Sequence, residues 1–295
     1  MDVSAGADER AWLDIAGETD WAALWRDLVV ARARCLDDGS VVDPSSSRFI
    51  DPWESRARDY DERVARRWAE PDSTRRFVLE QIAEGATLLD IGAGTGAWAA
   101  LVAPHAACVT AVERSPAMIR ILEENLAVRR ITNVNVVQGS WPEVAVEPHD
   151  FSLCAHAMYW SPDLPEFVGR MAECTRRMCF LLLRAPSPQG IMAEAALHLW
   201  GNRIDSPNLT VAENVLRQMG LKPHVRMELG GVREPRQSAS FTEALQRMKR
   251  HFGVCDTTEH DEYFGALLRR RLGYENGRYI WPPDDRSALI HWTVE

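Results

Sequence analysis

Hydrophobic runs and amphipathic segments alternate regularly through the middle of the chain. Short, mostly apolar runs, typical of buried strands, fall near residues 87–91, 108–112, 133–137, 150–155 and 178–184. Segments with apolar residues at helical spacing lie before and between them, near residues 73–84, 96–103, 116–129 and 163–177. Ser115 and Pro116 predict the start of the third, as N-cap and first helical residue. Strands that alternate with helices in this way predict βαβ units, whose strands form a parallel sheet. The expected fold class is therefore α/β, with a doubly wound sheet.

Further apolar patterns flank this core on both sides. Residues 8–36 carry tryptophans at helical spacing, which predicts a pair of helices whose tryptophans pack in a core rather than form a ligand cage. After the fifth strand we expect helices over 191–201 and 208–219, and strands near 224–229 and 288–294. Roughly fifty residues separate these two strands, and they contain amphipathic segments around 241–248 and 263–272. So long a connection is usually functional, which predicts a helical cap on the substrate side.

These breaks predict the domain organisation. The turn-forming stretches Asp38–Ser40 and Pro44–Ser47 are typical of a linker. We expect an N-terminal helical extension, a core, a helical cap insertion and the last strand of the core, at residues 1–47, 48–231, 232–284 and 285–295.

Composition and charge exclude several classes of function. The chain has 295 residues, of which 46% are hydrophobic, and this is ample for a core. The net charge of −9 disfavours a nucleic-acid partner. No signal peptide or bilayer-spanning run is evident, so we expect a cytoplasmic protein without a membrane partner; a homodimer is compatible with the sequence. The six cysteines form no CxxC pair and are expected to be reduced thiols, mostly buried. The spacing of His251, Cys255 and His260 fits no standard zinc site, so no metal is expected.

A glycine-rich turn is the strongest chemical signal in the chain. The run Leu88–Gly96 has the sequence LLDIGAGTG and leads from an apolar strand into a predicted helix. Such a turn permits positive φ angles and lets the backbone approach a nucleotide-like ligand closely. The pattern Gly92-x-Gly94-x-x-Ala97 also fits the relaxed dinucleotide fingerprint. Asp90 argues against that alternative, because dinucleotide folds usually keep this strand end apolar.

The same residues resemble the first motif of Rossmann-type S-adenosylmethionine-dependent methyltransferases, an acid followed by Gly-x-Gly-x-Gly. Asp90, Gly92, Gly94 and Gly96 match that motif, and the resemblance extends over roughly residues 51–229. It implies that the turn passes beside the methionine part of the cofactor S-adenosylmethionine and that Asp90 reaches its amino group. It also implies a seven-stranded, mostly parallel sheet whose last strand is antiparallel.

The remaining cofactor contacts are expected along the next strands. Glu113 ends the second strand about twenty residues after the first glycine, where an acid can accept both ribose hydroxyls. Family members often carry an acid at the position of Ser140, so adenine contacts would fall to the Ser140 hydroxyl, the backbone and the Trp141 ring. A helix is expected from Asp51 to Trp68, and many small-molecule methyltransferases begin with a similar helix that folds an aromatic residue over the cofactor. Tyr60 is the matching residue, and packing at a helix interface is its alternative role.

His156 is the candidate general base. It follows the fourth strand, at the sheet edge where open α/β folds bind ligands, and its ordinary pKa suits proton removal near neutrality. Alternatively, the ring packs against the adenosyl group or bonds to the backbone. The resemblance implies a methyltransferase acting on a small-molecule acceptor, which the sequence does not name. Two other hypotheses stay open: an NAD(P)-dependent oxidoreductase, and a non-catalytic methyltransferase-like binding or regulatory protein.

Overall fold

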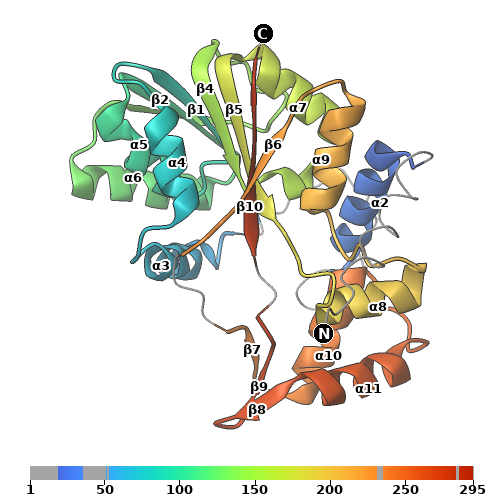
Figure 1. Cartoon of the computed structure of the whole chain (residues 1–295). Coiled ribbons are helices and arrows are strands. Elements are labelled where there is room, and N and C mark those ends of the chain that lie inside the picture. The colour runs from blue at the N-terminus through green and yellow to red at the C-terminus, as the bar shows by residue number, and fades with distance from the viewer. Residues whose placement is uncertain (1–18, 36–50, 52, 231–234, 284–285, 295) are drawn as a thin grey trace, which may run out of the picture.

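A seven-stranded mixed sheet forms the centre of the protein (Figure 1). The computed structural model describes residues 19–35, 51, 53–230, 235–283 and 286–294. The strand order is β3-β2-β1-β4-β5-β10-β6. The strands are β1 (Thr87–Ile91), β2 (Cys108–Glu113), β3 (Val134–Gln138), β4 (His149–Ala155), β5 (Thr175–Arg184), β6 (His224–Met227) and β10 (Ser287–Thr293).

Strand direction places the ligand-binding edge of this sheet. Strands β1 to β5 pair in parallel, and β10 runs antiparallel to both β5 and β6. The expected sheet, mostly parallel with an antiparallel last strand, is therefore confirmed. The carboxyl ends of the parallel strands share one edge, and the strand order reverses between β1 and β4. Open α/β sheets bind ligands in the crevice at such a point.

Helices cover both faces of the sheet (Figure 1). Helices α4, α5 and α6 cover one face of the sheet, and their side chains Val78, Trp98 and Leu122 belong to the buried apolar cluster there. Helices α2, α7 and α9 cover the other face. Trp21 and Trp25 of α2 are buried there, as expected for core residues. The helices are α2 (Trp21–Ala33), α3 (Ala57–Arg67), α4 (Ser73–Gln81), α5 (Ala97–Val102), α6 (Pro116–Arg129), α7 (Leu164–Glu173), α8 (Ile191–Trp200) and α9 (Leu209–Gln218).

Several boundaries differ from the sequence expectation. The helix predicted over 163–177 ends at Glu173, because Thr175 already pairs with His149 of β4. The helix expected from Asp51 begins at Ala57, after a turn in which the Arg56 amide donates to the carbonyl of Trp53. The first helix of the predicted N-terminal pair lies outside the described residues.

The segment between β6 and β10 forms a small unit of its own. It contains α10 (Phe241–Phe252) and α11 (Asp261–Arg271), as expected, and also a three-stranded sheet that the sequence analysis missed. Its strands are β7 (Gln237–Ser238), β8 (Gly273–Glu275) and β9 (Arg278–Ile280), in the order β7-β9-β8. Helix α8 shares a buried apolar cluster with α10 and α11. We call the described residues 235–283 the cap; they lie beyond the carboxyl ends of the parallel strands (Figure 1).

A disulfide between Cys35 and Cys255 joins α2 to the cap, so the expectation of reduced thiols is wrong at these two positions. Cys154, Cys174 and Cys179 are buried free thiols, as expected. The contact between the two elements is close, since a Cβ atom on Gly253 would lie 2.0 Å from the carbonyl oxygen of Ala31. None of the helices within the described ranges is long and apolar enough to cross a bilayer.

Candidate functional site

Two glycines of the turn after β1 are required by packing. Gly92 has a φ of 70°, and an added Cβ would lie 2.2 Å from the Cβ of Ala157, in the loop that follows β4. Gly96 has a φ of 83°, and its Cβ would lie 2.8 Å from Cγ of Leu122 on α6. Only glycine tolerates both the backbone conformation and the close approach, so these two positions let the turn fit between β4 and α6.

Gly94 has a different environment, which is open toward α3. Its φ is 57°, and a Cβ would meet only Cε1 of Tyr60, at 3.8 Å. The ring of Tyr60 thus lies over the turn, and it packs edge-on against Trp53 with ring centroids 5.1 Å apart. Asn125 of α6 holds α3 there, because its side-chain amide donates to Oδ1 of Asp61, at 2.9 Å, and to the Thr95 carbonyl, at 3.0 Å.

Glu113 connects the turn to the start of α6. Its Oε2 accepts from the Gly94 amide at 2.9 Å, and its Oε1 accepts from the Ser115 amide at 2.8 Å. Ser115 in turn caps α6, as its sequence predicts, by accepting from the Met118 amide. Burial raises the pKa of the Glu113 carboxyl, and hydrogen bonds from the backbone amides of Ser115, Gly94 and Arg114 oppose that effect. The acid therefore sits in a fixed position at the carboxyl end of β2.

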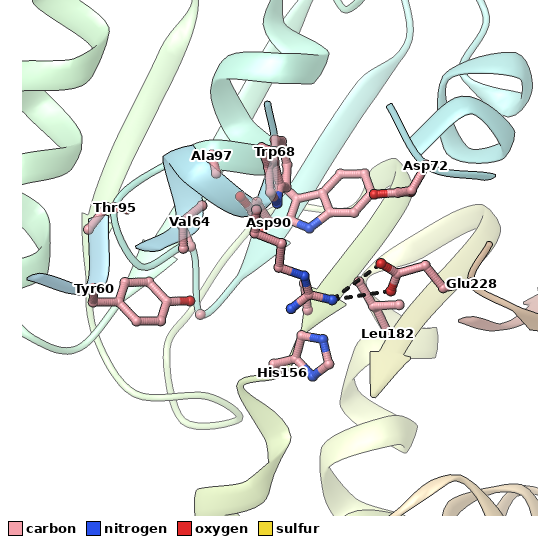
Figure 2. Close-up of a pocket in the computed structure, with 15 residues that line it drawn as sticks. Tyr60, Val64, Trp68, Asp72, Asp90, Thr95, Ala97, His156, Leu182 and Glu228 are labelled. Carbon is pink, nitrogen blue, oxygen red and sulfur yellow. Dashed lines mark hydrogen bonds and ion pairs between the residues drawn. The ribbon is translucent and has the colours of Figure 1, made fainter. Parts of the chain in front are cut away.

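A pocket opens between α3 and the carboxyl edge of the sheet (Figure 2). Asp90 at its base is 1% exposed, and its Oδ2 has no hydrogen-bond partner among the described residues. Burial raises the pKa of this carboxyl to about 7. The buried hydroxyl of Thr95 also lacks a partner there. The lining residues are Tyr60, Val64, Arg67, Trp68, Asp72, Asp90, Gly92, Ala93, Thr95, Ala97, Trp98, Ala155, His156, Leu182 and Glu228.

Unpartnered buried polar atoms are costly and therefore rare in folded proteins. Two of them in one pocket indicate that the site is built to receive a polar ligand. Asp90 supplies a carboxylate oxygen and Thr95 supplies a hydroxyl, so the ligand needs a hydrogen-bond donor near Asp90. An ammonium group fits that requirement best, because its charge also lowers the cost of ionising the acid.

His156 lines the same pocket at the carboxyl end of β4 (Figure 2). Its φ of 58° is rare for a residue with a side chain, and such strain concentrates at functional sites. The Nδ1 atom lies 3.3 Å from the Tyr159 hydroxyl, and Nε2 lies 3.4 Å from the Ser287 hydroxyl. The ring is therefore oriented by hydroxyl groups on both sides.

Arg67 and Glu228 also line the pocket, and the sequence analysis missed both. Figure 2 draws the ion pair between them as dashed lines ending on the Glu228 carboxylate. The two residues are 161 positions apart in the chain, so no local pattern could have linked them. Trp68 and Trp98 form an apolar part of the wall, with ring centroids 5.3 Å apart.

The pocket brings together only part of the predicted site. Tyr60, Asp90, Gly92 and His156 line it, whereas Gly94 and Glu113 lie just beneath Tyr60. Gly96 faces Leu122, as described above. Ser140 is exposed beyond the end of β3. The Trp141 indole donates to the Phe167 carbonyl at 3.1 Å and packs against the Phe167 ring, so its hydrogen-bonding group is directed to the core.

Comparisons with known proteins agree with this arrangement. Residues 88–178 match the sequence model of a family described as a methyltransferase domain. This segment of the chain is therefore a methyltransferase-like domain. The match favours the methyltransferase hypothesis over the oxidoreductase alternative. A comparison with curated proteins finds no match to the sequence.

Solved structures show the same fold. The methyltransferase is similar to the YcgJ protein from Bacillus subtilis, with a TM-score of 0.51 and 14% identity over 75% of this chain and 97% of that chain. It is also similar to a protein from Bacillus halodurans C-125, with a TM-score of 0.50 and 14% identity over the same shares, 75% and 97%. Identities this low support the fold alone.

Proposed function

We propose that the methyltransferase binds S-adenosylmethionine beneath α3 and transfers its methyl group to a small-molecule acceptor between the sheet edge and the cap. The observation that supports this best is the unpartnered Oδ2 of Asp90 in the pocket beside the glycine turn. A buried carboxylate oxygen without a partner is destabilising, and the ammonium group in the methionine half of S-adenosylmethionine would remove that cost.

The other cofactor contacts follow from the placement of the neighbouring residues. Backbone amides donate to both oxygens of the Glu113 carboxylate, and we assign its remaining lone pairs to the ribose hydroxyls. Gly94 leaves room for the methionine part between the turn and Tyr60. Adenine contacts are assigned to Ser140 and the edge of Trp141, past the end of β3.

S-adenosylmethionine supplies an activated methyl group, so the chain's own residues need to align the acceptor and exclude water. Alignment of reacting groups can lower a barrier by roughly 7–11 kcal/mol. Helix α3 covers the glycine turn, and the cap lies over the same sheet edge (Figure 1). We assign His156 the role of general base for an acceptor that must lose a proton. The Tyr159 and Ser287 hydroxyls orient its ring.

Calorimetric titration with S-adenosylhomocysteine, compared with NAD and NADP, tests the cofactor assignment. We expect binding of S-adenosylhomocysteine alone and its loss in Asp90→Ala, whereas a folded Asp72→Ala protein should retain it, because Asp72 is paired with Arg75. Binding of a nicotinamide cofactor instead, or full affinity in a folded Asp90→Ala protein, would overturn the proposal.

The role of His156 is tested by the pH dependence of methyl transfer once an acceptor has been found by screening. We expect His156→Gln to lower the rate and to remove a rise in rate through the ordinary histidine range. The exposed His105 is the matched control, and His105→Gln should leave the profile unchanged. A His156→Gln enzyme with the same profile as the wild type would instead assign the ring to packing.

A further inference from the structure

The Nη2 group of the Arg67 guanidinium is anchored within the described part of the chain, whereas its Nε and Nη1 groups are not. Its Nη2 lies 3.3 and 3.2 Å from the two carboxylate oxygens of Glu228 and donates to the Ser287 hydroxyl at 3.0 Å. Its Nε and Nη1 donate to no residue that the structure describes. The side chain lines the ligand pocket and is 37% exposed, while that of Glu228 is 3% exposed. The Arg67 guanidinium therefore has N–H donors left for a ligand in this pocket.

The two anchoring residues give Arg67 a fixed position. Glu228 follows β6, where the chain leaves the sheet toward the cap, and Ser287 begins β10, where it returns. The Glu228 amide donates to the Ser287 carbonyl at 3.0 Å, which holds these two ends together. Since Arg67 belongs to α3, its anchored edge links the helix over the cofactor pocket to the base of the cap.

The methionine half of the proposed cofactor carries a carboxylate as well as an ammonium group. Asp90 suits the ammonium, so the same pocket should hold a cation for the carboxylate. Arg75 does not qualify, because its guanidinium already pairs with Asp72 and donates to the carbonyls of Trp68 and Glu70. Arg67 is the arginine among the pocket-lining residues. An arginine that keeps its charge and a free Nη1 group can donate a charge-assisted hydrogen bond to a carboxylate.

We propose that Arg67 binds the methionyl carboxylate of the cofactor through its free Nη1 group, and that Glu228 and Ser287 position it. This inference rests on the proposed function. It predicts selectivity for ligands that keep the carboxylate. The alternative partner of Arg67 is a carboxylate on the acceptor substrate, and the experiment below distinguishes the two.

Calorimetry with three ligands measures this selectivity. S-adenosylhomocysteine has both charged groups, 5′-deoxy-5′-(3-aminopropylthio)adenosine lacks the carboxylate, and 5′-methylthioadenosine lacks both. We expect wild-type protein to bind the first about 10- to 100-fold more tightly than the second, as is typical of hydrogen bonds between charged groups. In Arg67→Met this ratio should fall to near 1, with little change in affinity for the second ligand.

Matched variants separate this role from structural effects. Arg66→Met removes an exposed arginine from the same helix and should leave the ratio at its wild-type value. Arg67→Lys keeps the charge without the planar fork and should give an intermediate ratio. Glu228→Gln should also lower the ratio, because the guanidinium loses its anchor. Thermal melts identify variants that fail to fold. If Arg67→Met does not fold, the affinity ratio of folded Arg67→Lys decides the test.

The outcomes separate a failure of the proposed function from a failure of the Arg67 assignment. If wild-type protein binds none of the adenosyl ligands, the proposed function fails. If it binds S-adenosylhomocysteine, but the ratio is unchanged in folded Arg67→Met and Arg67→Lys, the assignment of Arg67 is overturned while the function stands. An unchanged ratio together with a raised KM for a carboxylate-bearing acceptor would assign Arg67 to the acceptor instead.

Discussion

Replacing Asp90 with asparagine should make the ligand-free protein more stable while it removes cofactor binding. Burial raises the pKa of this carboxyl from 3.8 to about 7, and each pKa unit corresponds to about 1.4 kcal/mol. The ionised group therefore destabilises the ligand-free fold by about 4 kcal/mol at most above pH 7. Because the asparagine amide would be buried without an acceptor, at a cost of about 1–3 kcal/mol, a net gain of about 1–3 kcal/mol is expected at pH 8.

The sign of the pH dependence follows from proton uptake. Between the unfolded pKa of 3.8 and the folded pKa of about 7, the folded protein holds the Asp90 proton more tightly than the unfolded chain. The contribution of this group to stability is thus complete below about pH 4 and is lost as the pH rises to 7. The advantage of Asp90→Asn should accordingly be largest at pH 8 and disappear near pH 5.

Ligand binding should favour the ionised form of Asp90, whereas folding alone favours the protonated form. An ammonium next to Asp90 favours the carboxylate, so binding must release the Asp90 proton below pH 7. Affinity for S-adenosylhomocysteine should fall about tenfold for each pH unit below 7 and level off above it. Calorimetry in buffers of different ionisation enthalpy measures the released proton directly.

Thermal melts at pH 8 and pH 5 test the stability of Asp90→Asn, with Asp72→Asn as control. Asp72 lines the same pocket but pairs with Arg75 at 2.7 Å, so its replacement should lower the melting temperature. A folded Asp90→Asn protein that melts at or below the wild-type temperature at pH 8 would refute the reasoning, as would pH-independent affinity.

Three further predictions concern the turn, the ribose contact and the cap. Gly92→Ala should lower stability by about 2 kcal/mol or more, since its Cβ would overlap that of Ala157, and adding Ala157→Gly should recover part of the loss in urea unfolding. Glu113→Gln should weaken S-adenosylhomocysteine binding by about 1.5–3 kcal/mol; titration showing no loss would limit Glu113 to holding the turn. Replacing Cys35 and Cys255 with serine should cost about 2–4 kcal/mol, and the wild-type protein should show the same loss when reduced.

Much of the core was predictable because its signals are local. Apolar runs flanked by polar segments located the first five strands of the sheet to within a few residues. Ser115 followed by Pro116 marked the start of α6, since a capping hydroxyl and a fixed φ act within one helical turn. The acid and glycines around Asp90 indicated a ligand site, because a turn with positive φ angles has a recognisable composition.

The boundaries between helices and strands were harder to predict where one apolar run fits both the helical and the strand spacing. The helix predicted over 163–177 includes Val168, Met171 and Cys174, all buried, and the run of β5 follows at once. Local pattern does not separate the two elements. Pairing of Thr175 with His149 of β4 starts the strand there, and that pairing is a tertiary contact. The strands of the cap sheet have only two or three residues each, too few to show a period.

The complete pocket exists only in the folded chain. The sequence by itself determined the glycine turn, Asp90 and the direction of most strands, because these depend on residues a few positions apart. The folded structure brought Arg67 to Glu228 and Ser287, which are 161 and 220 positions away, and turned the Trp141 indole toward Phe167. Such contacts depend on which helix crosses which sheet edge. That crossing depends on the apolar surface that whole helices and strands bury against one another, and no short segment of the sequence encodes it.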